Sequence, residues 1–257
     1  MIDVNSQPAP DDKMTDWFDI GARCKESFPI LHATWNEVCS AAGPLRDNHP
    51  VGELRELIHS AILIGQHTIY SSTLITRYTR IEANNVYQDY VLYYFYNFIG
   101  RIMSSSDIFG LIINHVYSLE LEESKCGLHR GSITNRLDTD KASKELSVVI
   151  NRARDQWLIA FYHMRNLVLH RTGIKLIIGN DIGDSLINIQ LGDMLSVPSE
   201  REILEKFLLG IGLDVPPTCI LDPVILCEHL FNAWQSIVNE IMIHLKDRIP
   251  DFIDEKI

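Results

Sequence analysis

The sequence predicts an all-α protein, an up-and-down helical bundle with a small β-hairpin insertion near residues 174–191. Apolar residues recur at helical spacing along most of the 257-residue chain. Prolines and glycines stand where these helices would begin and end. A single segment has alternating β-branched residues on either side of a turn rich in glycine, asparagine and aspartate, which is the pattern of a hairpin.

The predicted helices follow one another with short interruptions. In order along the chain they are expected at 17–24, 30–42, 51–81, 86–103, 108–121, 141–171, 198–209 and 223–248. Proline marks several starts, because its missing N–H costs no hydrogen bond in the first turn. Pro50 precedes the third helix, and Asp222-Pro223 opens the last one with Asp222 as its cap. Pro250 is expected to end that helix.

Aromatic residues are dense between positions 86 and 103. Tyrosine and phenylalanine favour strands, but the length of the segment and the spacing of its aromatic residues favour a helix. The polar run from Ser104 to Asp107 is expected to interrupt it, with Asp107 capping the next helix. The aromatic run would suit stacking on nucleic-acid bases; its density of leucine, valine and isoleucine favours a core or a dimer interface.

The remaining segments lack a helical pattern. Residues 122–140 are expected to form a loop, and residues 175–178 and 185–190 the two strands of the hairpin. Residues 1–15 are polar, contain two prolines and are predicted to form a flexible N-terminus. Residues 16–257 show no repeat and no low-complexity linker, so a single domain is expected there.

The charge and the cysteines restrict the class of protein. The net charge is −11 at pH 7, whereas proteins that coat nucleic acids are basic. Any contact with RNA is therefore expected at a few positive groups. The five cysteines are odd in number and form no C-x-x-C pair, which argues against a disulfide framework and a structural zinc site. With no signal-peptide pattern and no apolar run of about 20 residues, the sequence predicts a cytoplasmic protein without a membrane span.

One short stretch, Tyr162–Arg171, stands apart near the end of its predicted helix. Asn166 and His170 are four residues apart and share a helix face, which His163 joins three residues before Asn166. The long side chain of Arg165 can reach the same face. The resulting polar ridge is costly to bury unless its groups are satisfied or line a cleft.

These residue types suit the cleavage of a phosphodiester. Histidine titrates near neutral pH, so His170 can accept a proton from a ribose 2′-OH or donate one to the leaving oxygen. Arginine binds phosphate oxygens through its guanidinium fork, and asparagine can orient its neighbours. The 2′-OH is an internal nucleophile, so neither a metal nor a cofactor is required. His163 and His170 lack an evident third ligand for zinc, and no metal site is predicted.

The sequence Arg165-Asn166-x-x-x-His170 resembles the R-x4-6-H motif of the HEPN superfamily, and the chain most resembles uncharacterised bacterial HEPN-like proteins. In that superfamily the motif lies on a long helix of an up-and-down bundle, and two protomers pair so that two motifs line one cleft. Many members are metal-independent endoribonucleases of toxin–antitoxin, phage-defence and RNA-processing systems. The resemblance covers the motif and its helix; it does not explain the hairpin or the N-terminal part.

The resemblance implies a homodimer that cleaves RNA, with Arg165, Asn166 and His170 as catalytic residues and His163 and Arg171 in contact with the substrate. An antitoxin or another partner protein is an expected ligand. Two alternatives remain. One is an inactive HEPN-like module that binds a partner protein or a nucleotide, which the acidic charge favours. The other is an unrelated helical protein in which these basic residues merely favour the negative end of a helix dipole.

Overall fold

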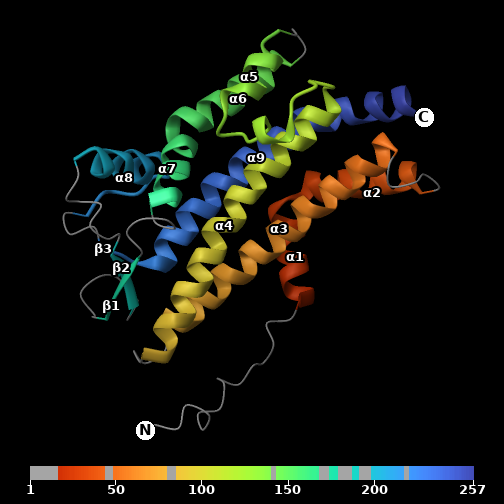
Figure 1. Ribbon diagram of the computed structural model, residues 1–257. Helices are drawn as coiled ribbons and strands as arrows, with labels where there is room; N and C mark the ends of the chain where they lie inside the picture. Colours follow the sequence, from red (N-terminus) through yellow and green to blue (C-terminus); the bar gives the residue numbers. More distant parts are fainter. Residues whose placement is uncertain are drawn as a thin grey trace.

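The computed structural model describes residues 17–43, 49–79, 85–139, 143–167, 174–178, 187–190, 198–216 and 220–257. Helices make up most of this part, and a small antiparallel sheet lies beside them (Figure 1). The predicted fold class, an all-α bundle with a small hairpin, is confirmed. The expected flexible N-terminus, residues 1–15, lies outside the described residues.

Several helices begin or end close to the prolines and glycines that mark their predicted bounds. In order they are α1 (Trp17–Ser27), α2 (Pro29–Ala42), α3 (Pro50–Thr79), α4 (Asn85–Val116), the 3-10 turn η1 (Glu123–Lys125), α5 (Gly131–Leu137), α6 (Lys144–Ala153), the π-helical segment η2 (Arg154–Leu158), α7 (Ile159–Leu167), β1 (Lys175–Ile178), β2 (Ile187–Gln190), α8 (Pro198–Gly210), β3 (Ile220–Leu221) and α9 (Pro223–Lys256). The expected cap of α9 is present, since the Oδ1 of Asp222 accepts a hydrogen bond of 2.8 Å from the backbone N–H of Val224.

The core lies among the three longest helices, α3, α4 and α9, which run side by side through the bundle (Figure 1). Large apolar side chains such as Phe98 of α4 and Phe252 of α9 are almost completely buried there. Helices α1 and α2 cover one side of α3. Phe28, at the junction of α1 and α2, packs its ring against Trp234 of α9 with 4.9 Å between ring centroids. Burial of this apolar surface is the main source of stability in such a bundle.

The predicted interruption at Ser104–Asp107 is wrong, because α4 continues through it. Serine and aspartate favour caps when their side chains compete for backbone groups. Here Ser104 donates a hydrogen bond to the carbonyl of Gly100, four residues back in the same helix, at 3.0 Å. Ser105 accepts one of 2.9 Å from the indole N–H of Trp234. The partner on α9 satisfies the serine within the helix, and Asp107 is a helical residue rather than a cap.

The predicted end of the last helix is also wrong. Helix α9 passes through Pro250 and continues to Lys256. A proline inside a helix removes one backbone hydrogen bond and costs about 3 kcal/mol. Beyond it, however, Phe252 and Ile253 are both buried. Their burial favours two further turns, because each large apolar side chain contributes roughly 1.5–3 kcal/mol when it is removed from water.

The predicted hairpin is confirmed. Strands β1 and β2 pair antiparallel, with Lys175 opposite Gln190 and Leu176 opposite Ile189. A third strand, β3, was not expected and extends the sheet by pairing Ile189 with Leu221. Its two residues are too few to give an alternating pattern in the sequence.

The middle of the chain departs most from expectation. The segment 122–140, expected to be a loop, contains η1 and α5, and the single helix expected at 141–171 begins at Lys144 and is divided by the π-helical segment. The loop before α5 lies directly on α4, because a Cβ at Gly110 would sit 1.5 Å from the carbonyl oxygen of Cys126. This close approach brings the loop next to α7.

Candidate functional site

Helix α7 carries three of the five residues that the sequence predicted for the site. The guanidinium of Arg165 donates a hydrogen bond of 2.8 Å from Nη1 to the Oδ1 of Asn166, and both side chains are half-buried. His163 is exposed on the same helix. The structure therefore brings Arg165 and Asn166 into contact. His170 and Arg171 lie outside the described residues.

The Nε of Arg165 is buried and has no hydrogen-bond partner among the described residues. Buried polar atoms are nearly always paired, and leaving one unpaired costs about 1–3 kcal/mol, more when the group is charged. Asn166 holds one end of the guanidinium in place, while the Nε at its other end stays buried and unpaired among the described residues.

The π-helical segment η2 precedes α7 directly. Such a segment holds an extra residue in a helical turn, which turns the following helix relative to the preceding one, and it occurs frequently at functional sites. Helix α8 supports it at backbone distance, since a Cβ at Gly210 would lie 2.1 Å from the carbonyl oxygen of Gln156. This packing fixes the direction from which α7 presents Arg165.

A histidine that the sequence did not single out lies against α7. The ring of His129, in the loop before α5, stacks on the ring of Tyr162 with 4.2 Å between centroids and 10° between planes. Its side chain is only 8% exposed, and its Nδ1 lies 4.0 Å from Oδ1 of Asp107 on α4. Neither ring nitrogen has a hydrogen-bond partner among the described residues. A Cβ at Gly127 would come within 2.5 Å of this ring and 2.6 Å of the Asp107 carboxylate, so any larger residue there would require these side chains to shift.

Three arginines surround the imidazole. Burial, followed by the charges of Arg130, Arg154 and Arg165 and by His163, lowers the pKa of His129 to about 4. His129 is therefore neutral at pH 7. Arg154 is tied to the fold, because it donates to the Oδ1 of Asn151 at 2.7 Å and to the carbonyl of His129 at 3.4 Å.

Asp107 is the acidic member of this group. Desolvation by the surrounding protein raises the pKa of its carboxyl, whereas the charges of Arg130 and Arg165 lower it. The carboxylate lies on the same side of α4 as the loop that carries His129. It offers the imidazole a partner that is 4.0 Å away, beyond hydrogen-bond distance.

Together these residues form what we call the Arg165 cluster: Asp107, His129, Arg130, Arg154, Tyr162, His163, Arg165 and Asn166. The charges of three arginines act on His129, and two of them, Arg130 and Arg165, also act on the Asp107 carboxyl, in a chain whose net charge is −11. A signal for His129 is present in the sequence, because the basic pair His129-Arg130 stands between Gly127 and Gly131. Because residues 122–140 are predicted to form a loop, the sequence does not single out His129 as a site residue.

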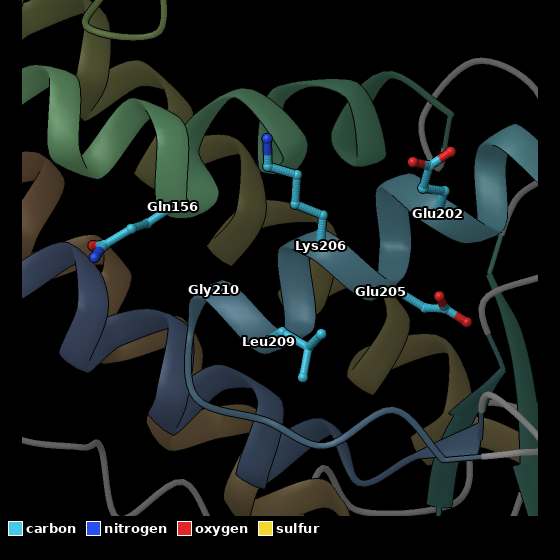
Figure 2. A pocket seen from close by; sticks show the side chains of 6 residues that line it. All are labelled: Gln156, Glu202, Glu205, Lys206, Leu209 and Gly210. Atoms are coloured by element: carbon cyan, nitrogen blue, oxygen red, sulfur yellow. The ribbon is translucent and has the colours of Figure 1, made fainter.

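A separate hollow lies where α8 meets η2 and does not belong to this cluster. Figure 2 shows the residues that line it: Gln156, Glu202, Glu205, Lys206, Leu209 and Gly210. The side chains of Lys206 and Gln156 point away from Glu202 and Glu205 (Figure 2). The hollow therefore lacks convergent polar groups, which a specific ligand site requires.

No three histidine, cysteine, aspartate or glutamate side chains in the described ranges come close enough together to hold a metal ion. Within the same ranges, no helix has the length and apolar character needed to cross a bilayer.

No protein-family model, no curated protein and no solved structure matches this chain. The resemblance to the HEPN superfamily therefore rests on the motif and its helical setting, and it remains a prediction.

Proposed function

We propose that the protein is a HEPN-type, metal-independent endoribonuclease that cleaves RNA by attack of a 2′-OH on the adjacent phosphate. The observation that carries the proposal is the oriented pair Arg165–Asn166, whose guanidinium keeps a buried, unpaired Nε. It belongs to a cluster of positive groups in an otherwise acidic protein. A local cluster of this kind suits one phosphate better than the long backbone of a coated nucleic acid.

Each predicted residue has a role in this proposal. Arg165 binds the phosphate that is cleaved, and its charge is complementary to the negative charge that develops there. Asn166 orients the guanidinium through the 2.8 Å hydrogen bond. His170 moves the proton as general acid or base, because an imidazole titrates near neutral pH. His163, exposed on α7, and Arg171 contact the neighbouring part of the RNA.

The proposal includes a homodimer, in which two copies of the motif line one cleft. A composite site would supply a histidine and an arginine on each side of the phosphate. The dimer is tested independently of activity by sedimentation velocity of the purified protein: a monomer at all concentrations would contradict this part of the proposal.

The main alternative is a HEPN-like module without catalytic activity that binds a partner protein, such as an antitoxin, or a nucleotide. Two observations favour it: the net charge of −11 and the position of the Asp107 carboxylate beside the arginines. Both weaken attraction for a polyanion. A basic partner surface or a single nucleotide is less affected by them than a long RNA.

An RNase assay in the presence of EDTA tests the proposal. Wild type, His170→Ala and His59→Ala are compared on a mixed RNA substrate. His59 is exposed on α3 and serves as the matched histidine control. We expect cleavage by wild type and by His59→Ala, and none by His170→Ala, with products that end in a 2′,3′-cyclic phosphate or its hydrolysed form.

Cleavage that persists in His170→Ala would contradict the assignment of the histidine. Absence of cleavage by a well-folded wild-type dimer would favour the binding module. A clear loss of thermal stability in His170→Ala would instead indicate a structural histidine, since a residue on a polar ridge should contribute little to folding.

A further inference from the structure

We propose that the Arg165 cluster binds a phosphate group between Arg130 and Arg165, and that His129 takes up a proton when the phosphate binds and then pairs with Asp107. The inference deepens the proposed function, on which it rests for the identity of the phosphate group as part of RNA. It assigns to His129, a residue outside the motif, a response to the substrate.

Several buried nitrogen atoms without hydrogen-bond partners lie together in the Arg165 cluster. The two ring nitrogens of His129 and the Nε of Arg165 all lack hydrogen-bond partners in the described part of the chain. Proteins leave few such atoms, and each one calls for a compensating partner. A phosphate oxygen is an acceptor that would satisfy the guanidinium. A second proton on the imidazole would make both ring nitrogens donors, and Nδ1 is the one that lies 4.0 Å from Oδ1 of Asp107.

The arginines of the cluster differ in how many of their donors are already hydrogen-bonded. Arg154 donates hydrogen bonds to Asn151 and to the carbonyl of His129, so it holds the loop that carries His129 in place. Arg130 is exposed, and Arg165 is half-buried with a donor unused. The charges of both arginines lower the pKa of the Asp107 carboxyl, so both act on the same carboxylate. A pair of guanidinium groups around one point is the usual way in which proteins bind a phosphate.

Binding of a phosphate and protonation of His129 are coupled through the charges around the imidazole. Charged or titratable groups face His129 from each element packed against it. They are Asp107 of α4, Arg130 of its own loop, Arg154 of η2, and Tyr162, His163 and Arg165 of α7. The arginines disfavour a proton on the imidazole. A bound phosphate neutralises them, so the proton affinity of His129 rises.

The geometry supplies a partner for the charged form. The Nδ1 of His129 lies 4.0 Å from the Oδ1 of Asp107. A movement of about 1 Å would turn this contact into a charge-assisted hydrogen bond. The stacking on Tyr162 restricts the plane of the imidazole ring. When a phosphate binds to Arg130 and Arg165, their charges are neutralised and no longer stabilise the Asp107 carboxylate. The imidazolium of His129 then becomes its positively charged partner.

NMR of protein labelled with 15N-histidine tests the inference, with inorganic phosphate as the probe. The titration of His129 is followed in chloride and in phosphate at equal ionic strength, and His129→Gln identifies its signals. We expect a midpoint near 4 in chloride. In phosphate we expect an increase on the order of one pH unit. The increase should be lost in the double variant Arg130→Gln, Arg165→Met, while the signal of His59 stays the same in every sample.

A midpoint of His129 that is the same in chloride and phosphate would overturn the inference. So would an increase that survives in the double variant, because the phosphate would then act elsewhere. A second arm replaces inorganic phosphate by uridine 3′-monophosphate. A response at lower concentration of the nucleotide indicates that the phosphate belongs to RNA; an equal response indicates a site for free phosphate.

The two proposals fail separately. A phosphate response without RNA cleavage would leave this inference intact and contradict the nuclease. Cleavage with no response of His129 would leave the nuclease intact and contradict this inference.

Discussion

Buried polar groups occur both where Ser105 of α4 meets Trp234 of α9 and in the Arg165 cluster. The two places differ in whether these groups have hydrogen-bond partners among the described residues. In the interface between α4 and α9, the indole of Trp234 donates to Ser105, and the polar pair is satisfied within an apolar core. In the cluster, His129 and Arg165 keep buried nitrogens without partners. The first arrangement contributes to stability and specificity of packing. The second costs stability, as expected of groups held ready for a ligand.

The largest effect is expected in the apolar region. Phe28→Ala should lower the free energy of unfolding by about 3–5 kcal/mol, because it leaves a cavity beside Trp234 and Phe231. Denaturant unfolding measures this loss. The matched control is Phe18→Ala, whose side chain is 85% exposed, with an expected change within about 0.5 kcal/mol. Equal losses in the two variants would contradict the assignment of the core.

A smaller loss is expected where the loop of His129 touches α4. Gly110→Ala places a Cβ 1.5 Å from the carbonyl oxygen of Cys126, so the loop must shift, at a cost of roughly 3 kcal/mol. A Cβ at Gly100, in the same helix, would have no atom within 4 Å. Gly100→Ala should therefore raise the free energy of unfolding by about 0.5–1 kcal/mol. Thermal unfolding of both variants tests this pair: a destabilised Gly100→Ala, or a neutral Gly110→Ala, would contradict the packing.

The cluster should make stability depend on pH. Burial and the neighbouring arginines lower the pKa of His129 in the folded protein to about 4, below its ordinary value of 6.5. The unfolded chain therefore binds more protons between these values, and stability falls as the pH falls from 6.5 to 4. Between pH 6.5 and 4, the free energy of unfolding should fall by about 2 kcal/mol more in wild type than in His129→Gln. Parallel pH profiles for the two proteins would contradict the neutral, buried imidazole.

The sequence predicted the apolar region better than the polar one. Helix starts at Pro50 and Pro223 depend on local chemistry, and they were predicted correctly. The continuity of α4 and α9 depends on partners distant in sequence, such as Trp234 for Ser105, and it was not predicted.

Within the cluster, Arg165 and Asn166 could be predicted from the sequence because they are adjacent along the chain and both helical. His129 was missed because its proximity to Tyr162 and Asp107 arises from the packing of the loop on α4. No spacing rule along the chain connects positions that tertiary packing brings together. His170 and Arg171 lie outside the described residues, so their roles rest on the motif alone.

The most direct test compares two arginines of the cluster in the same experiment. Arg154→Met removes hydrogen bonds to Asn151 and to the carbonyl of His129, and should lower the free energy of unfolding by about 1–3 kcal/mol. Arg165→Met removes one hydrogen bond, to Asn166, together with a buried Nε that has no partner among the described residues. Because these two effects oppose one another, the free energy of unfolding should stay within about 0.5 kcal/mol of wild type or rise.

RNA cleavage is measured on the same samples. Arg165→Met should retain the fold and lose cleavage by about 100-fold or more, since it removes the group proposed to bind the phosphate. That result would establish Arg165 as a ligand-binding residue rather than a structural one. A loss of stability in Arg165→Met equal to that of Arg154→Met, or full cleavage by Arg165→Met, would contradict the account.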